Sequence, residues 1–567
     1  MKRAARRSNA SLLPLILFAA LAAFSSPFNA FAQKPQDAAK LIQKGAESLA
    51  KRDWKGAREQ YQKAVRADAR NVEANYGLGV AQMNLKQWAD ALAAFSNVIA
   101  AKPNPRVRDA LANTGRINYG LKDYAKAADA LESAAESGDI GADGYYFLGK
   151  SYVETQRAAK ALDVFRRATA DPQYAQDAYF NVGYLLTTQD RGREAVAPLE
   201  QAARLDPRHA PSQMLLGGAY LAADRPDDAL AALRAADSLS PNQFFTHLGL
   251  GFAHSSLYHN EEAMAAFNVA LRLQPQSPDA LAGLGGIYAR TGRYREAEDS
   301  LARAAALKPN DPNVLLGQSY LFYAQGQYPR FVEAARQAAR LAPQNVAAQT
   351  MLGAALAITG DMAGGIKAVR EGVKLEPENY WPHHVLGFIL VREDKAQEAL
   401  SEARAAARIR PNYPETQNLL AYVLNQLGQH QEALQAAQSA LQYKHEPADE
   451  GWAHYNVASA QEKLGRAEEA RASYTASIRA YNQPGRTLDP DDLYIMGNAY
   501  LRLDQDPQAI KAFQQAIKVR PDFPQARYNL GLAYIATNNR RGAQDEYNAL
   551  KRIDAARAAK LLSLMKR

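Results

Sequence analysis

The stretch LAGLGGIYARTGRYREAEDSLARAAALKP, from Leu281 to Pro309, repeats a pattern that the chain has already used. Gly285, Ala297 and Pro309 each have an identical residue 34 positions earlier. Self-similarity at a fixed period of about 20–50 residues indicates stacked structural repeats. It therefore takes precedence over the several globular domains that a length of 567 residues would otherwise suggest.

The pattern occurs fifteen times, and the spacing is 34 residues throughout its central part. Each unit contains two helical patterns, separated by Gly, Asn or Asp, which tolerate the left-handed backbone that ends a helix. Ser277, Asp311 and Asp489 each precede a proline, as an N-cap residue precedes Pro at the first helical position. The units begin at Ala38, Val72, Arg108, Ala142, Gln176, Ala210, Phe244, Pro278, Pro312, Val346, Tyr380, Pro414, Gly451, Pro490 and Pro524.

Small residues recur where the two helices of a unit are expected to cross. The eighth position is Gly in twelve of the fifteen units, and the twentieth is Ala in thirteen. A larger side chain at such a crossing would cost about 1–3 kcal/mol. Large side chains instead recur at the twenty-fourth position, at Tyr61, Phe95, Phe165, Phe267, Phe513 and Tyr547.

This pattern resembles the tetratricopeptide repeat (TPR) family, most clearly in QARYNLGLAYIATNNRRGAQDEYNAL, from Gln525 to Leu550. The resemblance implies an all-α, right-handed solenoid of about fifteen helix-turn-helix units, with first helices along a concave surface. We expect units 1–12 at 38–447, units 13–15 at 448–550 after an insertion, and a capping amphipathic helix at 551–567.

The N-terminus has the three parts of a secretory signal. A basic start is followed by an apolar run from Leu12 to Phe24 and by small residues around Ala30 and Ala32. We predict a signal peptide at 1–32, cleavage before Gln33 and a short linker at 33–37; retention as a membrane anchor is the alternative. Export to the periplasm, or secretion, follows, with no integral membrane span after cleavage.

Composition argues against several functions. The formal charge of +9 falls to +5 without the predicted signal, a dispersed excess that does not favour nucleic acid. The chain has no cysteine, which excludes disulfides and thiol catalysis.

GYYFLGKS, from Gly144 to Ser151, matches a phosphate-loop pattern but lies inside a predicted helix, so we expect no nucleotide site. The histidines show no paired zinc motif, and no catalytic constellation appears; we expect no metal, no cofactor and no enzymatic activity.

A partner is expected on the stripe formed by positions 2, 5, 9 and 12 of the first helices. The Lys and Asn residues with which some family members clamp a carboxylate are missing from it. Aromatic side chains occur instead, and these bury area with little loss of side-chain entropy. We discount Tyr at position 5, such as Tyr494 and Tyr528, as family consensus. The predicted partner-binding residues are Phe180, Tyr184, Phe245, Phe252, Tyr320, Tyr323, Trp381, His384, Phe388 and Tyr422.

Units nine to twelve are expected to carry the main contact surface, because units nine and ten break the repeat's rules at Ser319, Phe331 and Gly365. A hinge is the alternative interpretation. The sequence therefore predicts a non-enzymatic scaffold of the periplasm or cell envelope that binds peptide segments or assembly subunits on its concave face. The alternative is a scaffold that binds glycans or polysaccharides in an envelope export system.

Overall fold

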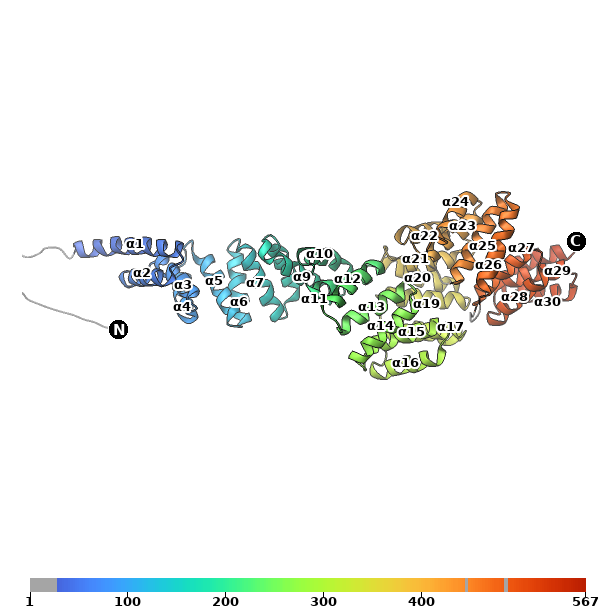
Figure 1. The fold of residues 1–567 in the computed structure, drawn as a ribbon, viewed down its shortest axis with the longest axis horizontal. Coiled ribbons are helices and arrows are strands. Elements are labelled where there is room, and N and C mark those ends of the chain that lie inside the picture. Colours follow the sequence, from blue (N-terminus) through green and yellow to red (C-terminus); the bar gives the residue numbers. More distant parts are fainter. Residues whose placement is uncertain (1–27, 444–446, 484–487, 567) are drawn as a thin grey trace, which may run out of the picture. The chain divides into compact units, whose positions relative to one another are not determined.

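The computed structural model describes residues 28–443, 447–483 and 488–566, which form α-helices joined by short turns (Figure 1). They divide into two compact units, and the boundary in the sequence falls between Leu185 and Leu186, within one helix. Residues 1–27 of the predicted signal lie outside the described residues. The first helix begins at Phe28 and includes the segment 33–37 that the sequence suggested as a linker.

The first unit contains antiparallel pairs in which the first and second helices of each repeat pack together. Its helices are α1 (Phe28–Ala50), α2 (Trp54–Ala67), α3 (Val72–Asn84), α4 (Trp88–Ala100), α5 (Val107–Gly120), α6 (Tyr124–Glu136), α7 (Gly141–Glu154), α8 (Ala158–Ala168) and most of α9 (Pro172–Thr188).

The second unit continues the same pairing. Its helices are α10 (Gly192–Leu205), α11 (Ala210–Ala222), α12 (Pro226–Leu239), α13 (Phe244–Ser256), α14 (Asn260–Leu273), α15 (Pro278–Arg290), α16 (Tyr294–Leu307), α17 (Pro312–Ala324), α18 (Tyr328–Leu341), α19 (Val346–Ile358), α20 (Met362–Leu375), α21 (Tyr380–Arg392), α22 (Ala396–Ile409), α23 (Pro414–Gln426), α24 (His430–Ala440), α25 (Pro447–Lys463), α26 (Ala467–Tyr481), α27 (Pro490–Arg502), α28 (Asp506–Val519), α29 (Pro524–Ala536), α30 (Arg540–Ile553) and α31 (Ala555–Met565). The predicted all-α solenoid is confirmed.

The predicted helix starts and stops are confirmed. The Ser277 side chain accepts from the backbone N–H of Ala280, and the Asp489 side chain accepts from the N–H groups of Asp491 and Asp492. Side-chain oxygens at these caps satisfy N–H groups that have no partner within the helix. Turns within repeats contain a left-handed residue, at positive φ, at Gly292, Gly326, Gly360, Gly428 and Gly465.

The side chain at the twenty-fourth position of a repeat fills the space that glycines of two successive repeats leave. Phe267 is fully buried, and a Cβ added at Gly251 or Gly283 would come within 2.6 or 2.5 Å of its ring. Real Cβ atoms do not approach so closely, and cores at crystal-like density have no spare room. Packing therefore requires glycine at both positions, as predicted for the eighth.

The rule-breaking residues of units nine and ten are part of tight packing. Phe331, which replaces the usual Ala, is buried, and its ring lies 5.6 Å from that of Tyr323. A Cβ added at Gly365 would lie 2.8 Å from the carbonyl oxygen of Gly353, so α19 and α20 approach closely there.

The C-terminal end of the solenoid is covered by α31, as expected for the capping segment. Asp554 separates α31 from α30 and caps α31 by accepting from the N–H of Arg557. Leu561 of α31 is buried beside Leu550. The boundary suggested near residue 448 stays a prediction, although one hydrophobic cluster extends from Ala357 to Ala460 across it.

Candidate functional site

Five of the predicted partner-binding residues surround a cavity of about 390 Å³ within the second unit, called here the larger inner cavity. Its walls come from α17, α19 and α21, which carry stripe residues, and from α25 and α27 of later repeats. The predicted residues that line it are Tyr320, Tyr323, Trp381, His384 and Phe388. The structure therefore brings together residues that are more than 60 positions apart in sequence.

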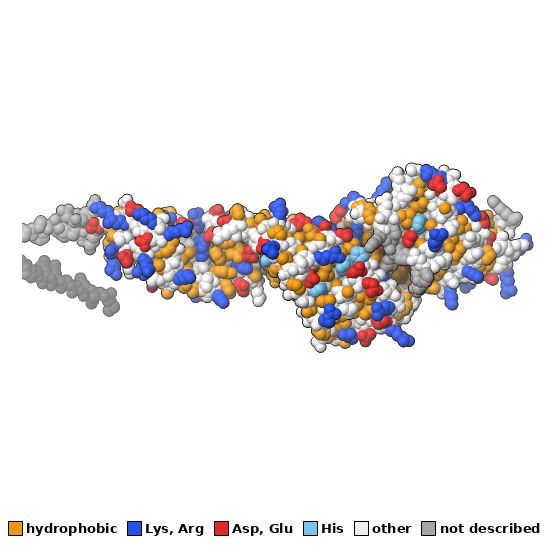
Figure 2. All heavy atoms as spheres, viewed as in Figure 1, with side chains coloured by type: hydrophobic (Ala, Val, Ile, Leu, Met, Phe, Trp, Pro, Cys, Tyr) orange, Lys and Arg blue, Asp and Glu red, His pale blue; other side chains and the backbone are white. Residues whose placement is uncertain are grey.

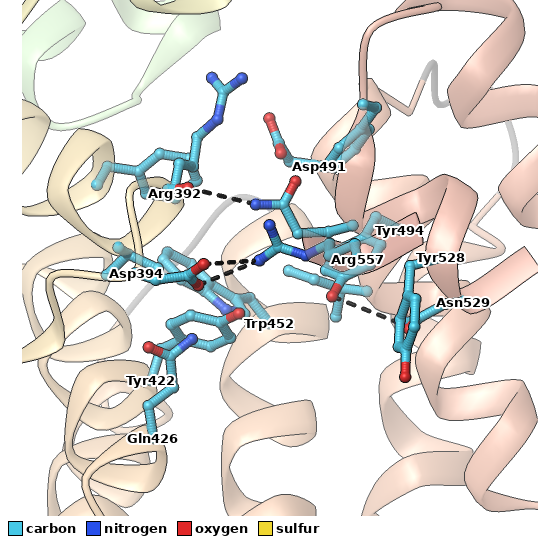
Figure 3. A pocket seen from close by; sticks show the side chains of 15 residues that line it. Arg392, Asp394, Tyr422, Gln426, Trp452, Asp491, Tyr494, Tyr528, Asn529 and Arg557 are labelled. Carbon is cyan, nitrogen blue, oxygen red and sulfur yellow. Dashed lines mark hydrogen bonds and ion pairs between the residues drawn. The ribbon is translucent and has the colours of Figure 1, made fainter. Parts of the chain in front are cut away.

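A second cavity of about 200 Å³, the smaller inner cavity, is lined partly by the same residues (Figure 3). Phe388 and Trp452 line both cavities, and Tyr422 lines the smaller one. The centroid of the Trp452 ring lies 6.0 Å from the ring centroid of Phe388 and 6.1 Å from that of Tyr422. Tyr422 thus belongs to the same site as the five residues of the larger cavity.

Side chains of later repeats reach across the stripe of α17 and α21. The hydroxyl of Tyr323 donates to Asp489 at 3.2 Å. Arg557 of α31 forms an ion pair with Asp394 at 3.1 Å, and the Gln525 amide donates to the backbone carbonyl of Arg392 at 3.4 Å (Figure 3). The stripe here lines cavities bridged by α25–α31, where the sequence suggested an open concave surface.

The acidic groups beside the larger cavity are held by neighbours. Arg520 is almost fully buried, and its guanidinium lies 3.0 and 2.5 Å from the carboxylate oxygens of Asp491. Burial acts to raise the pKa of Asp491, but Arg520 holds it below its ordinary value. Burial and the neighbouring Asp491 raise the pKa of Asp489. The charge of Asp489, followed by burial, raises the pKa of Tyr323.

Three side chains that line the cavities have a buried nitrogen without a hydrogen-bond partner: Arg392 Nε, Trp452 Nε1 and His384 Nδ1. Burial lowers the pKa of His384 to about 4, so its imidazole is neutral near pH 7. Burial also lowers the pKa of Arg392 from its ordinary value. Buried polar groups of this kind each cost about 1–3 kcal/mol while unpaired.

Two predicted residues on α13 are placed differently, on the surface. The Phe245 side chain is 64% exposed and that of Phe252 is 37% exposed, and neither lines the inner cavities. Gly218 and Gly286 occupy the register of Phe252 in the repeats before and after it, and a Cβ at either would meet only open space. Phe252 therefore stands between two open positions on the same stripe.

The remaining two predicted residues lie on α9 in the first unit. The rings of Phe180 and Tyr184 are stacked with their centroids 6.4 Å apart, and Tyr184 is 42% exposed. Of the ten predicted residues, six thus line the inner cavities, two lie on α13 and two lie on α9.

His383, His254 and His259 have local partners. His383 makes hydrogen bonds with Glu402 at 2.6 Å and with the carbonyl oxygen of Pro377 at 3.0 Å. The Nδ1 atoms of His254 and His259 lie 3.3 Å apart. No group of three or more metal-ligating side chains occurs within the described residues.

The phosphate-loop pattern GYYFLGKS lies within α7, as the sequence indicated, and not on a loop. Among the helices that the structure describes, none is both long and apolar enough to cross a membrane. Figure 2 shows Lys and Arg interspersed with Asp and Glu over the visible face.

Sequence reasoning missed several residues of the inner cavities. Trp452 and Asp491 occupy position 2 of their repeats, so the stripe rule itself identifies them when it is applied to the last three units. Tyr494 and Tyr528 were discounted as consensus, yet both line the smaller cavity. Arg392 ends its helix outside the stripe, and no pattern in the sequence signals it.

Models of the TPR family match most of the chain. The models described as tetratricopeptide repeat match residues 48–114, 115–178, 180–244, 259–318, 316–380 and 453–484, and one described as TPR repeat matches 497–537. The chain belongs to the tetratricopeptide repeat family. No curated protein matches it significantly.

Among solved structures, this TPR chain is similar to a chain in the crystal structure of the APC/C hetero-tetramer Cut9–Hcn1. The TM-score is 0.50 at 15% identity, over 88% of this chain and 96% of that one. At this identity the similarity shows the fold alone. The family supports a protein–protein interaction scaffold of a type that is typically non-enzymatic.

Proposed function

We propose that this TPR protein is a non-enzymatic scaffold of the periplasm or cell envelope, and that it binds peptide segments or assembly subunits through exposed aromatic side chains. The observation that carries the proposal is the pair Phe245 and Phe252 on α13. Exposed Phe rings seven residues apart lie on one helix face. Aromatic anchors of this kind contribute most of the affinity at many protein interfaces.

The same stripe also has open space over Gly218 and Gly286, on either side of Phe252 along the stack. In this proposal a partner's side chains occupy the open space over these two glycines, while Phe252 itself packs against the partner. Contacts around an aromatic anchor exclude water from it, so a few residues supply most of the binding energy. A short peptide segment is therefore long enough to bind here.

Capture and titration with the full chain test this proposal. The bait is retained on a resin in envelope extract, and overlapping peptides from each captured protein are then titrated against wild type and against Phe245→Ala/Phe252→Ala. We expect a peptide whose affinity falls at least about tenfold in the double variant, as for a hot spot worth about 1.4 kcal/mol or more.

Leu239→Ala/Leu273→Ala is the control, because both residues are exposed to about the same extent as Phe252 but lie on second helices. It should bind the peptide as wild type does. Equal loss in both double variants, or no loss in either, contradicts the proposed surface.

Export is tested separately from binding. Fusion of residues 1–32 to a phosphatase that is active only outside the cytoplasm should give activity, and the mature chain should begin at Gln33. A fusion that stays inactive contradicts the envelope assignment while leaving the scaffold intact.

Glycan binding is the second candidate, and the smaller inner cavity favours it. Gln426 and Asp394 line it on the side of Tyr422 and Trp452, and Asn529 lines it beside Tyr494 and Tyr528 (Figure 3). Aromatic faces with amide and carboxylate groups beside them suit the apolar faces and hydroxyls of sugars. Saturable binding of an isolated polysaccharide, lost in Trp452→Ala, supports this candidate over the first.

A further inference from the structure

The larger inner cavity contains one basic side chain, and that side chain has no ion pair. Among the described residues that line it, Arg392 is the only Lys or Arg. Its Nε is buried without a hydrogen-bond partner. In Figure 3 the Arg392 guanidinium points away from the Asp394–Arg557 pair. An arginine fork presents several donors that match a carboxylate.

The acids nearby are already engaged. Asp491 is paired with Arg520, and Asp489 accepts from the Tyr323 hydroxyl and from two backbone N–H groups. Asp492 accepts from the N–H of Asp489 in the capping box. These partners occupy acceptor oxygens of the three carboxylates. Asp491 also attracts Arg392 electrostatically, but no ion pair within 4.0 Å joins the Arg392 guanidinium to any described acid.

Trp452, which also lines the cavity, carries a second buried donor without a partner. The donor is Nε1, and an indole N–H only donates. The imidazole of His384 also lines the cavity with an unpaired Nδ1. The groups left over are therefore mainly donors, and they are complementary to a ligand that carries acceptor oxygens.

The rest of the wall is apolar. Trp381, Phe388, Met351 and Ile358 line the cavity together with further aliphatic side chains. Its volume of about 390 Å³ lies within the range of small-molecule pockets, which is about 300–1,000 Å³. A cavity of this volume fits a compact molecule better than a polymer.

We propose that the larger inner cavity binds a small amphipathic carboxylate, whose apolar body packs against Trp381 and Phe388 and whose carboxylate accepts hydrogen bonds from Arg392 and Trp452. This site is independent of the surface on α13, so either can fail without the other.

The probe for this site is 4-phenylbutyrate, and its neutral counterpart is 4-phenylbutyramide. Titration of the full chain is followed by calorimetry and by tryptophan fluorescence, since two of the four tryptophans line the cavity. We expect saturable binding of the acid, at least tenfold weaker binding of the amide, and quenching that Trp452→Phe reduces. An amide that binds as well as the acid overturns the proposal and favours a neutral ligand such as a sugar.

Arg392→Gln should remove the preference for the acid while retaining amide binding. The control is Arg408→Gln on α22, because Arg408 is solvent-exposed and pairs with Glu378 away from the cavity. It should bind the acid as wild type does. Equal effects of the two substitutions contradict a carboxylate site at Arg392.

The thermal stability of Arg392→Gln distinguishes an Arg392 that binds a ligand from one that stabilises the fold. Since the buried Arg392 Nε has no partner, Arg392→Gln should leave the thermal midpoint unchanged or raise it. A fall of several degrees shows that Arg392 stabilises the fold through the acids of α27, and overturns the proposal. Added 4-phenylbutyrate should raise the midpoint of wild type and not that of Arg392→Gln.

Discussion

Asp224→Asn tests the electrostatics of a contact between distant repeats. Asp224 ends the turn between α11 and α12, and its carboxylate lies 3.2 Å from Nε of Arg410, which follows α22. Both side chains are largely buried. Burial raises the pKa of Asp224 to about 6, and the attraction of Arg410 offsets this only in part. The pKa of Arg410 is nevertheless raised, because Tyr380 and other neighbours outweigh its burial.

The direction of the pH effect follows from the raised pKa. The folded state holds the Asp224 proton more tightly than the unfolded state, so this group stabilises the fold below about pH 3.8 and loses that contribution as pH rises through about 6. A shift from 3.8 to about 6 corresponds to about 3 kcal/mol. Asn keeps the neutral form and tolerates the left-handed backbone of Asp224, φ 61°.

Urea unfolding of wild type and Asp224→Asn, at steps from pH 4 to 7.5, measures this effect. The free energy of unfolding of the variant relative to wild type should increase by about 2–3 kcal/mol over that range. Any constant cost of weakening the contact with Arg410 cancels in the change. In an Arg410→Gln background the increase should continue to higher pH, because the attraction that opposes burial is gone.

A difference that does not vary with pH would refute the reasoning. So would a wild type that gains stability relative to Asp224→Asn as pH rises. Either result means that the ion pair with Arg410 outweighs the burial of the carboxylate.

Three further predictions concern packing and charge in the second unit. Phe267→Ala should cost about 3–5 kcal/mol by urea unfolding, because the fully buried ring leaves a cavity between two glycines, while the exposed Phe245→Ala should cost little. Arg520→Met should cost about 3–5 kcal/mol because it leaves the buried carboxylates beside it unpaired; an unchanged urea midpoint would contradict this. The adjacent histidines should respond oppositely in thermal melts from pH 4 to 8. Burial acts to lower the pKa of His383, but the hydrogen bonds with Glu402 and Pro377 raise it overall, so its contribution is present below about 6.5 and is lost as pH rises. Burial lowers the pKa of His384 to about 4, so stability falls as pH drops below about 6.5, and His384→Gln should remove that loss.

Much of the candidate site follows from periodicity, since six of ten predicted aromatic or histidine residues line the two inner cavities. What surrounds these side chains in the folded chain does not follow from periodicity. Tyr323 and Phe245 lie on the same kind of stripe, yet Tyr323 is bridged to Asp489 and Phe245 is mostly exposed. The periodic pattern predicts which way a side chain faces within its own repeat. It does not predict which residues of a distant repeat lie opposite that side chain.

The sequence by itself determined the repeat, the caps, the left-handed turns and the pairing of glycines with large side chains, because these depend on residues within one repeat or its neighbour. Only the tertiary structure decided that the stripe is bridged. Tyr323 and Asp489 are 166 residues apart, and Asp394 and Arg557 are 163 apart. Such contacts depend on small rotations between repeats that accumulate along the stack, and no local pattern of side chains specifies their sum.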